Sequence, residues 1–344
     1  MDLLDTFKTW VAYTNQHGGI NGHQIKAVYT DDAGSSVTAL NNVKTMVGNG
    51  IQMIFGPIAF GTALAPIEPK GGFTNFIIAP IDQLYDPKVM PTTFDTYPTT
   101  ADVNSAIVKF AQQHNYKKWA IVNDGTLDTE AASLTSKAAA GAGATVVRND
   151  TVNPQAVDFS SEALKIKNSG ADAIMMYMIG PDVALFLQAI QAAGITTPIL
   201  NNSTASASDL SAAPVSLLQK QVFEAVTATS VLVNGSPSPG YVPYVSLLQK
   251  LYGKTAGGSA VGTEFDTYQI MGYAIAKAGG TDPAKVKQVM ESIKNQSFLS
   301  NQVNYTFTPT NHGIYNGAGF NGFEFVHPLP MSKTWPGFFP STAS

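Results

Sequence analysis

Cysteine is absent from all 344 residues of the sequence. This absence excludes disulfide bonds, thiolate zinc sites and a cysteine nucleophile. It is compatible with an oxidising compartment outside the cytoplasm, where a stray thiol is a hazard, but does not establish one. Long apolar runs are also absent: no stretch reaches the roughly 18 apolar residues of a membrane helix. The sequence therefore predicts no membrane span.

Charged residues are scarce, at 13%, and the formal net charge is −4. This balance argues against nucleic acid as a partner, because nucleic-acid binding needs a concentrated basic surface. Residues 1–16 are amphipathic and include Asp2 and Asp5 without a basic start, so they are not a signal peptide. The length suits two α/β lobes of roughly 120–180 residues each.

Predicted helices and strands alternate along most of the chain, which indicates parallel, doubly wound sheets. The predicted helices span residues 2–16, 36–48, 61–69, 101–114, 128–141, 159–168, 181–193, 238–255, 262–279 and 283–294. The predicted strands span residues 25–30, 51–55, 74–79, 118–122, 144–147, 173–177, 198–200, 223–227 and 303–307.

The run Gly-Gly-Ile-Asn-Gly-His at residues 18–23 separates the first predicted helix from a strand that ends in Asp31 and Asp32. This pattern resembles the start of the solute-binding proteins of the leucine/isoleucine/valine type, which carry "aGGInGr-x-I-x-l-v-x-x-D" there. His23 stands where that family usually has Arg. The resemblance extends from Met1 to about His312 through the order and spacing of its motifs.

The resemblance implies the type I periplasmic binding fold: α/β, with two Rossmann-like doubly wound lobes joined by a three-segment hinge. Lobe one is expected to comprise residues 1–97 and 228–304, and lobe two residues 98–227 and 305–344. The hinge crossings are expected near residues 95–99, 223–229 and 303–308. Closure of such a hinge around a ligand is the expected motion.

In the resembled family, a central strand and a ligand-touching loop precede the first helix. Here Met1 falls inside or just before that helix, so we expect the first strand to be missing from the sequence, through a clipped or misassigned start. Loss of a central strand exposes two rows of unpaired backbone groups. The alternative is a lobe rebuilt without that strand.

In open parallel sheets, ligands bind where the strands end. The strand ending at Phe55 leads into a loop where the family carries "GP-x-x-S", whose Ser and backbone amides hold a ligand carboxylate. Phe60 occupies the Ser position. Either Gly61 and Thr62 still form an anion seat with Phe60 as an aromatic wall, or Phe60 simply packs under the loop.

The next strand is followed by Ile81, Asp82 and Gln83. Asp82 could take a ligand ammonium or hydroxyl group, or it could cap the following turn. Gln83 favours neither interpretation.

Lobe two offers candidates after three of its strands. One loop matches the family's "x-D-x-x-y-G" but has lost its aromatic residue, and another matches "g-x-g-x-d", in which residues face the ligand. The residue at 178 could be a soft ligand contact or part of the core, and the loop at 201–204 could hold polar contacts or be an ordinary loop. The lobe-two candidates are Thr126, Leu127, Asp128, Met178, Gly180 and Asn202.

A helix of lobe one adds Phe265 and Asp266, which resemble the family's "yDa" and could supply a ring and a carboxylate. Compared with the family, polar anchors for an α-amino acid are fewer and apolar groups more numerous. The ligand hypothesis is therefore a small organic acid or amide with an apolar body, rather than a typical branched-chain amino acid.

The sequence gives little support for nucleotide binding, metal binding or acid catalysis. The Gly-Ala-Gly-Ala run at 141–144 ends a helix and enters a strand, whereas a phosphate loop leaves a strand and opens a helix. The five histidines include no His-x-x-x-His pair, so we expect no metal. Since no phosphate loop is found, we expect no cofactor either. Asp31 and Asp32 are interpreted as solvated strand-end carboxylates.

These inferences predict a non-enzymatic binding protein that delivers a small molecule to the membrane permease of an ABC transporter. We expect a monomer, located in the periplasm or outside the cell, with lipid anchoring through a segment outside this sequence as an option. The alternatives are a ligand-sensing regulator of the same fold and, with less support, a nucleotide-dependent enzyme.

Overall fold

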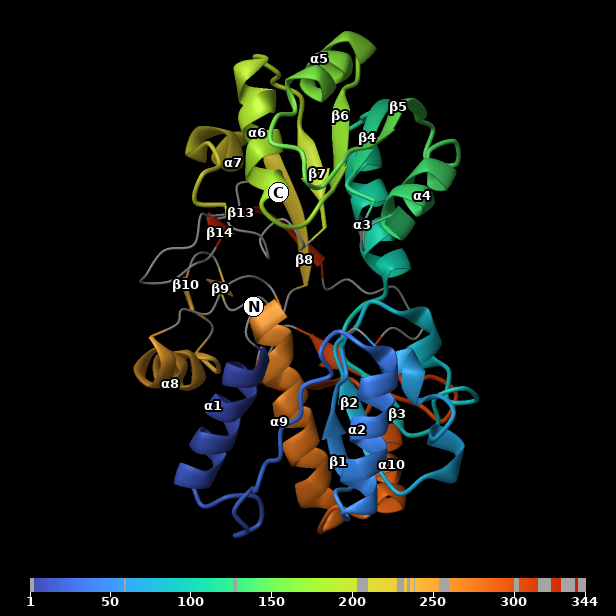
Figure 1. Ribbon diagram of the computed structural model, residues 1–344, viewed down its shortest axis with the longest axis vertical. Coiled ribbons are helices and arrows are strands. Elements are labelled where there is room, and N and C mark those ends of the chain that lie inside the picture. The colour runs from blue at the N-terminus through green and yellow to red at the C-terminus, as the bar shows by residue number, and fades with distance from the viewer. Residues whose placement is uncertain are drawn as a thin grey trace.

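The computed structural model places two sheets in separate bodies, one above the other along the long axis of the molecule (Figure 1). It describes residues 3–58, 60–125, 129–202, 210–227, 232–233, 236–237, 239–253, 260–299, 303–314, 323–328 and 338–339.

The lower body in Figure 1 contains a three-stranded parallel sheet in the order β1-β2-β3. Its strands are β1 (Met53–Phe55), β2 (Thr74–Ile77) and β3 (Thr93–Asp95). Around this sheet lie α1 (Leu3–Gln16), α2 (Ser36–Gly48), α8 (Val242–Tyr252), α9 (Ala260–Ala278) and α10 (Pro283–Ser292). An aromatic core that includes Trp10, Phe76, Phe94, Phe265 and Tyr268 joins α1 and α9 to the sheet.

The upper body contains a seven-stranded sheet in the order β14-β13-β8-β7-β6-β4-β5. Five strands are parallel: β4 (Lys118–Asn123), β5 (Thr145–Thr151), β6 (Ala173–Tyr177), β7 (Ile199–Asn201) and β8 (Val222–Thr227). β13 (Phe323–Pro328) pairs antiparallel with β8, and β14 (Phe338–Phe339) pairs antiparallel with β13. The buried strands are rich in apolar residues, as expected for a sheet covered on both faces.

Helices cover both faces of this sheet. α3 (Thr100–Gln113) and α4 (Thr129–Ala138) pack on one face. On the other face lie α5 (Ser160–Ser169), α6 (Asp182–Ala192) and α7 (Val215–Lys220). The first link between the bodies runs from β3 into α3, where Thr99 and Asp102 form a reciprocal capping box that fixes the start of the helix.

Short elements complete the described structure. The 3₁₀ helices η1 (Gly61–Leu64), η2 (Glu68–Lys70) and η3 (Asp82–Tyr85) follow β1 and β2. Two small antiparallel pairs join β9 (Leu232–Val233) to β10 (Ser236–Pro237) and β11 (Gln296–Ser297) to β12 (Asn304–Tyr305). Within the described residues, no helix is both long enough and apolar enough to cross a membrane.

Two predicted elements are wrong. The helix expected over residues 61–69 is instead split into η1 and η2, because Pro66 and Pro69 lack the amide hydrogens that a continuous helix uses. The strand expected over residues 25–30 does not form, and Val28 is 51% exposed. Its composition favours a strand, but the segment makes no backbone ladder with a neighbour, and a strand requires one.

The boundary predicted for the third crossing, near residues 303–308, is also corrected. The sequence predicts residues 305–344 in lobe two, whereas Tyr305, Phe307 and Ile314 belong to the same hydrophobic cluster as Phe94 of β3. Apart from the short strand β12, this segment is irregular. After β8, the described chain returns to the seven-stranded sheet at Phe323, where β13 begins.

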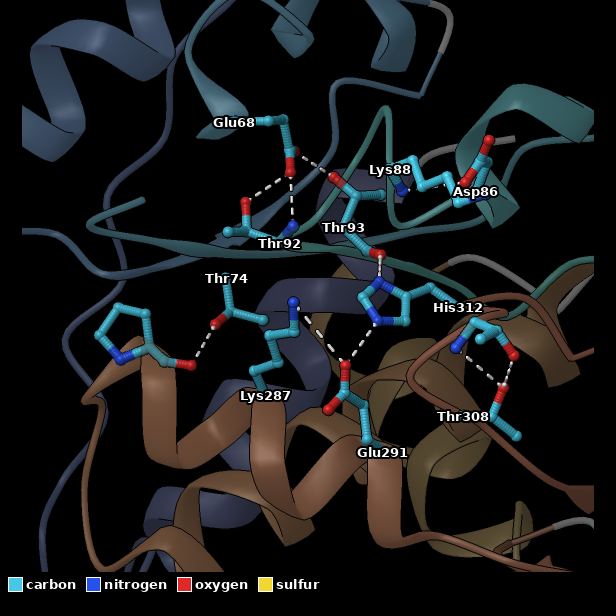
Figure 2. A network of polar contacts seen from close by, with 12 residues as sticks. Glu68, Thr74, Asp86, Lys88, Thr92, Thr93, Lys287, Glu291, Thr308 and His312 are labelled. Atoms are coloured by element: carbon cyan, nitrogen blue, oxygen red, sulfur yellow. Dashed lines mark hydrogen bonds and ion pairs between the residues drawn. The ribbon is translucent and has the colours of Figure 1, made fainter. Parts of the chain in front are cut away.

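Figure 2 shows the polar contacts that fix this segment in the lower body. His312 is fully buried, with Nδ1 3.0 Å from the carbonyl oxygen of Thr93 and Nε2 3.1 Å from Oε1 of Glu291. Burial lowers the pKa of His312, and Glu291 opposes that effect. Nearby, the buried carboxylate of Glu68 accepts hydrogen bonds from the amide and the hydroxyl of Thr92, both at 2.6 Å.

Candidate solute-binding site

The ends of the parallel strands in both sheets lie toward the junction of the two bodies. In the three-stranded sheet, β3 runs through residues 96–99 directly into α3 of the upper body. In the seven-stranded sheet, the chain leaves β8 and next forms β9, β10 and α8, which packs against α1. The C-terminal ends of parallel strands all lie on one side of their sheet, which we call its carboxyl edge. In each sheet the carboxyl edge faces the other body.

The carboxyl edge of the seven-stranded sheet contains a topological switch point. From β4 the chain moves outward to β5 and then returns to the other side of β4 to form β6. From β4 the chain continues to α4 on one face of the sheet, and from β6 it continues to α6 on the other face. Open α/β sheets bind ligands at such a switch point. The residues that follow these strands, beginning at Asp124 and Met178, are candidates on topological grounds.

At the edge of the three-stranded sheet, Phe60, Gly61 and Thr62 form the loop after β1. The amides of Gly61 and Thr62 and the hydroxyl of Thr62 donate no hydrogen bond within the described part of the chain, as expected where a helix begins. The ring of Phe60 is half-buried, makes no ring contact with a described residue and lies outside the hydrophobic clusters. This loop thus combines free donors with an available aromatic surface.

The second loop at this edge lies beside the first. A Cβ atom added to Gly61 would lie 3.2 Å from Leu84 of η3 and 2.5 Å from Ile77 of β2, so η1 packs closely on both. Ile81 is half-buried, and Asp82 and Gln83 are exposed. The expectation that Asp82 could cap this turn is wrong, because Ile81 holds the cap position and no side chain caps η3.

The candidates on α9 have partners inside the protein. Phe265 is fully buried, with its ring centroid 5.1 Å from that of Tyr244 and 6.1 Å from that of Tyr268. Asp266 is also fully buried and accepts a hydrogen bond of 2.9 Å from the hydroxyl of Tyr305. In this conformation both residues are part of the core of the lower body. Their contact with a ligand stays a prediction.

At the edge of the seven-stranded sheet, the predicted residues differ in their placement. Met178 is fully buried in the cluster between the sheet and α6, in line with the core alternative. Gly180 has a φ of +107°, a conformation that side chains with a Cβ rarely adopt. Asn202 is half-buried just beyond β7. Thr126, Leu127 and Asp128 lie outside the described residues.

Two further polar groups at this edge are buried without hydrogen bonds. Asp182, the first residue of α6, is 1% exposed, and neither of its carboxylate oxygens has a hydrogen-bond partner. Asn201, the last residue of β7, is fully buried, and neither its side-chain oxygen nor its nitrogen has a partner. The sequence places both residues after strands, but burial without a partner could not be predicted from it.

The carboxylate of Asp182 lies in an electrostatically unfavourable place. Burial and the nearby carboxylate of Asp124 raise the pKa of Asp182 to about 6. The amides of Asp182 and Val183 lower this pKa without forming a hydrogen bond of ordinary geometry. Asp124 itself accepts a hydrogen bond of 2.8 Å from the amide of Ile179, which ties the loop after β6 to the end of β4.

Metal ligation finds no support in the described part of the chain, where no three side chains of His, Cys, Asp or Glu are grouped to hold an ion. The arrangement is that of an α/β binding protein in which two carboxyl edges meet at the junction of two bodies. The family described as "Periplasmic binding protein" matches residues 1–318. The chain belongs to this family.

Known proteins agree with this assignment. The Leu/Ile/Val-binding protein homolog 7 of Brucella melitensis is 24% identical over 295 residues, which span 81% of this chain and 73% of the relative. The fold resembles that of a type 1 periplasmic binding protein from Bordetella pertussis, with a TM-score of 0.75 and 18% identity over 98% of this chain and 94% of that one.

A third similar protein is a solute-binding protein of an ABC transporter from Rhodopseudomonas palustris, solved in complex with 3,4-dihydroxybenzoic acid. It has a TM-score of 0.68 and 16% identity over 95% of this chain and 86% of that one. The predicted family and α/β fold are confirmed by these matches. Members of the family are extracytoplasmic solute-binding proteins rather than enzymes, and they work with ABC-transporter permeases.

Proposed function

We propose that this protein binds a small carboxylate-bearing solute with an apolar, ring-containing body between its two carboxyl edges and delivers it to the permease of an ABC importer. The two bodies act as lobes that close around the solute. The observation that carries the proposal is the loop of Phe60, Gly61 and Thr62, where unused donors lie next to an available aromatic ring. A carboxylate matches these donors, and a ring or branched chain matches Phe60.

The energy required is modest. A micromolar dissociation constant corresponds to about −8 kcal/mol. Hydrogen bonds to a charged group contribute about 1.5–3 kcal/mol each, and burial of an apolar ring contributes about 1.5–3 kcal/mol. Association also costs free energy, because the solute loses translational and rotational freedom. Two hydrogen bonds at one edge and one buried ring therefore do not reach this affinity alone, and contacts with the second edge are needed.

The relatives support the ligand class without defining it. The Rhodopseudomonas palustris protein was solved with an aromatic carboxylic acid, which has the same combination of carboxylate and ring. The Brucella melitensis relative carries the name of the branched-chain amino acid group. The aromatic residue at position 60 favours the first type of solute for this chain. We further propose that the protein works as a monomer in the periplasm or outside the cell, with or without a lipid anchor.

Calorimetric titration of the ligand-free protein tests the proposal. Benzoate, 4-hydroxybenzoate, 3-phenylpropionate and 4-methylpentanoate are compared with leucine and valine. We expect micromolar binding of at least one of the acids, together with weaker binding by Phe60→Ala and Thr62→Val. Leu164→Ala, an exposed apolar position on α5, is the matched control and should bind as the wild type does. Tight binding of leucine or valine with no response to any acid would overturn the proposed ligand class.

A further inference from the structure

Asp182 and Asn201 lie on the same face of the seven-stranded sheet. Ile199 packs in the cluster that contains residues of α6, and Leu200 packs in the cluster on the opposite face. Successive side chains in a strand alternate between faces, so Asn201 lies on the side of α6. Asp182 begins α6, and β7 is the direct neighbour of β6 with Asn201 opposite Met176. Two unsatisfied groups thus occur at adjacent strand ends, next to the switch point.

Neither side chain forms a hydrogen bond of ordinary geometry within the described residues. A buried polar group is normally hydrogen-bonded, because leaving it unpaired costs free energy. Asp182 forms no ion pair, and the nearest charge that acts on it is another carboxylate, Asp124. Neither the oxygen nor the nitrogen of the Asn201 side-chain amide forms a hydrogen bond. A purely structural role predicts partners for both side chains, whereas a binding role predicts that the partner arrives with the solute.

We infer that the solute carries an N–H or O–H donor at the end opposite its carboxylate, and that Asp182 accepts a hydrogen bond from this group while the side-chain amide of Asn201 bonds to the same group. The inference rests on the proposed function, because it assumes that the three-stranded sheet takes the carboxylate. It adds the class of substrate: hydroxy or amino acids with a distal donor, rather than simple carboxylic acids. A phenolic hydroxyl can donate to Asp182 and accept from the side-chain nitrogen of Asn201, and an aryl amine can donate one N–H to Asp182 and the other to the side-chain oxygen of Asn201.

The geometry also explains why the donor should be distal. The free donors near Thr62 belong to the lower body, and the free acceptors belong to the upper body. A solute that spans the junction has one end next to the donors of the lower body and the other end next to the acceptors of the upper body. An α-amino acid has its ammonium group next to the carboxylate, so one such solute satisfies both edges less well than an acid with a donor across its ring.

Two matched pairs of probes test the inference: benzoate against 4-hydroxybenzoate, and 3-phenylpropionate against 3-(4-hydroxyphenyl)propionate. Each is titrated into wild type, Asp182→Asn, Asn201→Leu and the control Glu162→Gln, which alters an acid in the first turn of α5. We expect wild type and control to prefer the hydroxylated member by about tenfold or more, the size of a hydrogen bond to a charged group. Both site variants should lose that preference while keeping their affinity for the unhydroxylated acid.

A wild type that binds both members of each pair alike, or site variants that keep the preference, would overturn the inference and leave the proposed binding of carboxylates intact. If none of the four probes binds, the proposed ligand class fails for these acids. Native mass spectrometry of the purified protein then decides the inference from the retained solute. A solute with a distal donor that is retained by wild type and lost from Asp182→Asn supports it, and one without such a donor overturns it.

Thermal unfolding of the ligand-free variants keeps the test independent of any probe. A carboxylate that serves the helix stabilises the fold, so its replacement by an amide should lower the unfolding midpoint. A carboxylate kept for a solute lacks a partner, so Asp182→Asn at about neutral pH should unfold at the same or a higher temperature. A clear drop in the midpoint relative to Glu162→Gln would contradict the binding role.

Discussion

The two carboxyl edges differ in the polar groups that they leave unused. At the edge of the three-stranded sheet, the unused groups are donors: the amides of Gly61 and Thr62 and the hydroxyl of Thr62. Gly61 is buried and Thr62 is half-buried. At the edge of the seven-stranded sheet, a carboxylate and an amide at Asp182 and Asn201 are buried without partners. The first arrangement suits an anion and the second suits a donor, so the pair suits one solute with two different ends.

The two edges also differ in how much their unused polar groups destabilise the ligand-free protein. Donors at a helix start can be hydrated while the site is empty, so they cost little. A buried carboxylate beside another carboxylate raises the free energy of the ligand-free protein. This difference means that mutations at the first edge should change binding alone, whereas mutations at the second should change both binding and stability.

The largest expected effect comes from removing the anionic end of the solute. Replacement of 4-hydroxybenzoate by 4-hydroxybenzamide should weaken binding about 100-fold or more, because at least two charge-assisted hydrogen bonds to the first edge are lost. Calorimetry measures the ratio directly. Equal affinity for the acid and the amide would show that the first edge does not recognise an anion.

The next largest effect concerns Asp182 and pH. Its pKa is raised from 3.8 to about 6, so the folded state holds the proton more tightly than the unfolded state. This contribution to stability is complete below about pH 4 and is lost as the pH rises through about 6. Asn cannot ionise, so Asp182→Asn should match wild type at about pH 4 and exceed it by about 2 kcal/mol at about pH 7.5.

Denaturant unfolding at the two pH values checks this prediction, with Glu162→Gln as the control for loss of a carboxylate. The control should show no comparable gain. A variant that is less stable than wild type at both pH values would mean that Asp182 has a partner that its geometry does not reveal.

A smaller effect is expected at Thr62. Thr62→Val keeps the shape of the side chain and removes its hydroxyl, so affinity for each carboxylate should fall about tenfold through loss of one hydrogen bond to a charged group. Thermal unfolding should be unchanged, since the hydroxyl has no partner in the described structure. Thr45→Val, on the α2 helix of the same body, provides the control for binding. The prediction fails if the two variants bind alike.

The smallest effect is expected at Phe60. Phe60→Ala should weaken binding of ring-containing acids about fivefold to tenfold, the order of one aromatic contact, and should leave short aliphatic acids unaffected. Titration with benzoate and butanoate separates the two. An equal loss for both would indicate that Phe60 shapes the loop rather than contacts the solute.

Much of this fold could be predicted because its signals are local. The periodicity of residues 36–48 defines α2, and the buried apolar run at residues 173–177 defines β6. Residues 25–30 have the composition of a strand, but composition cannot specify a neighbour, and none pairs with them. Residues 303–307 have the alternation of a crossing strand, but the contacts of Tyr305 and of the following His312 fix this part of the chain in the lower body.

The candidate site was harder to predict. The loop at residues 60–62 follows from the rule that ligands bind where parallel strands end. At the other edge the same rule predicts the loops but not the individual residues. Met178 is buried in the core, whereas Asp182 and Asn201 have buried polar groups without hydrogen-bond partners. Whether a buried side chain finds a hydrogen bond depends on distances between separate strands and helices, which no local pattern contains.

Hydrogen exchange measured by mass spectrometry, with and without 4-hydroxybenzoate, examines both edges in one experiment. If one solute bridges them, slower exchange should appear together in peptides covering residues 56–66 and 177–186, with a similar dependence on solute concentration. Protection confined to one of these segments, with the other unchanged at saturation, would contradict a site shared by the two edges.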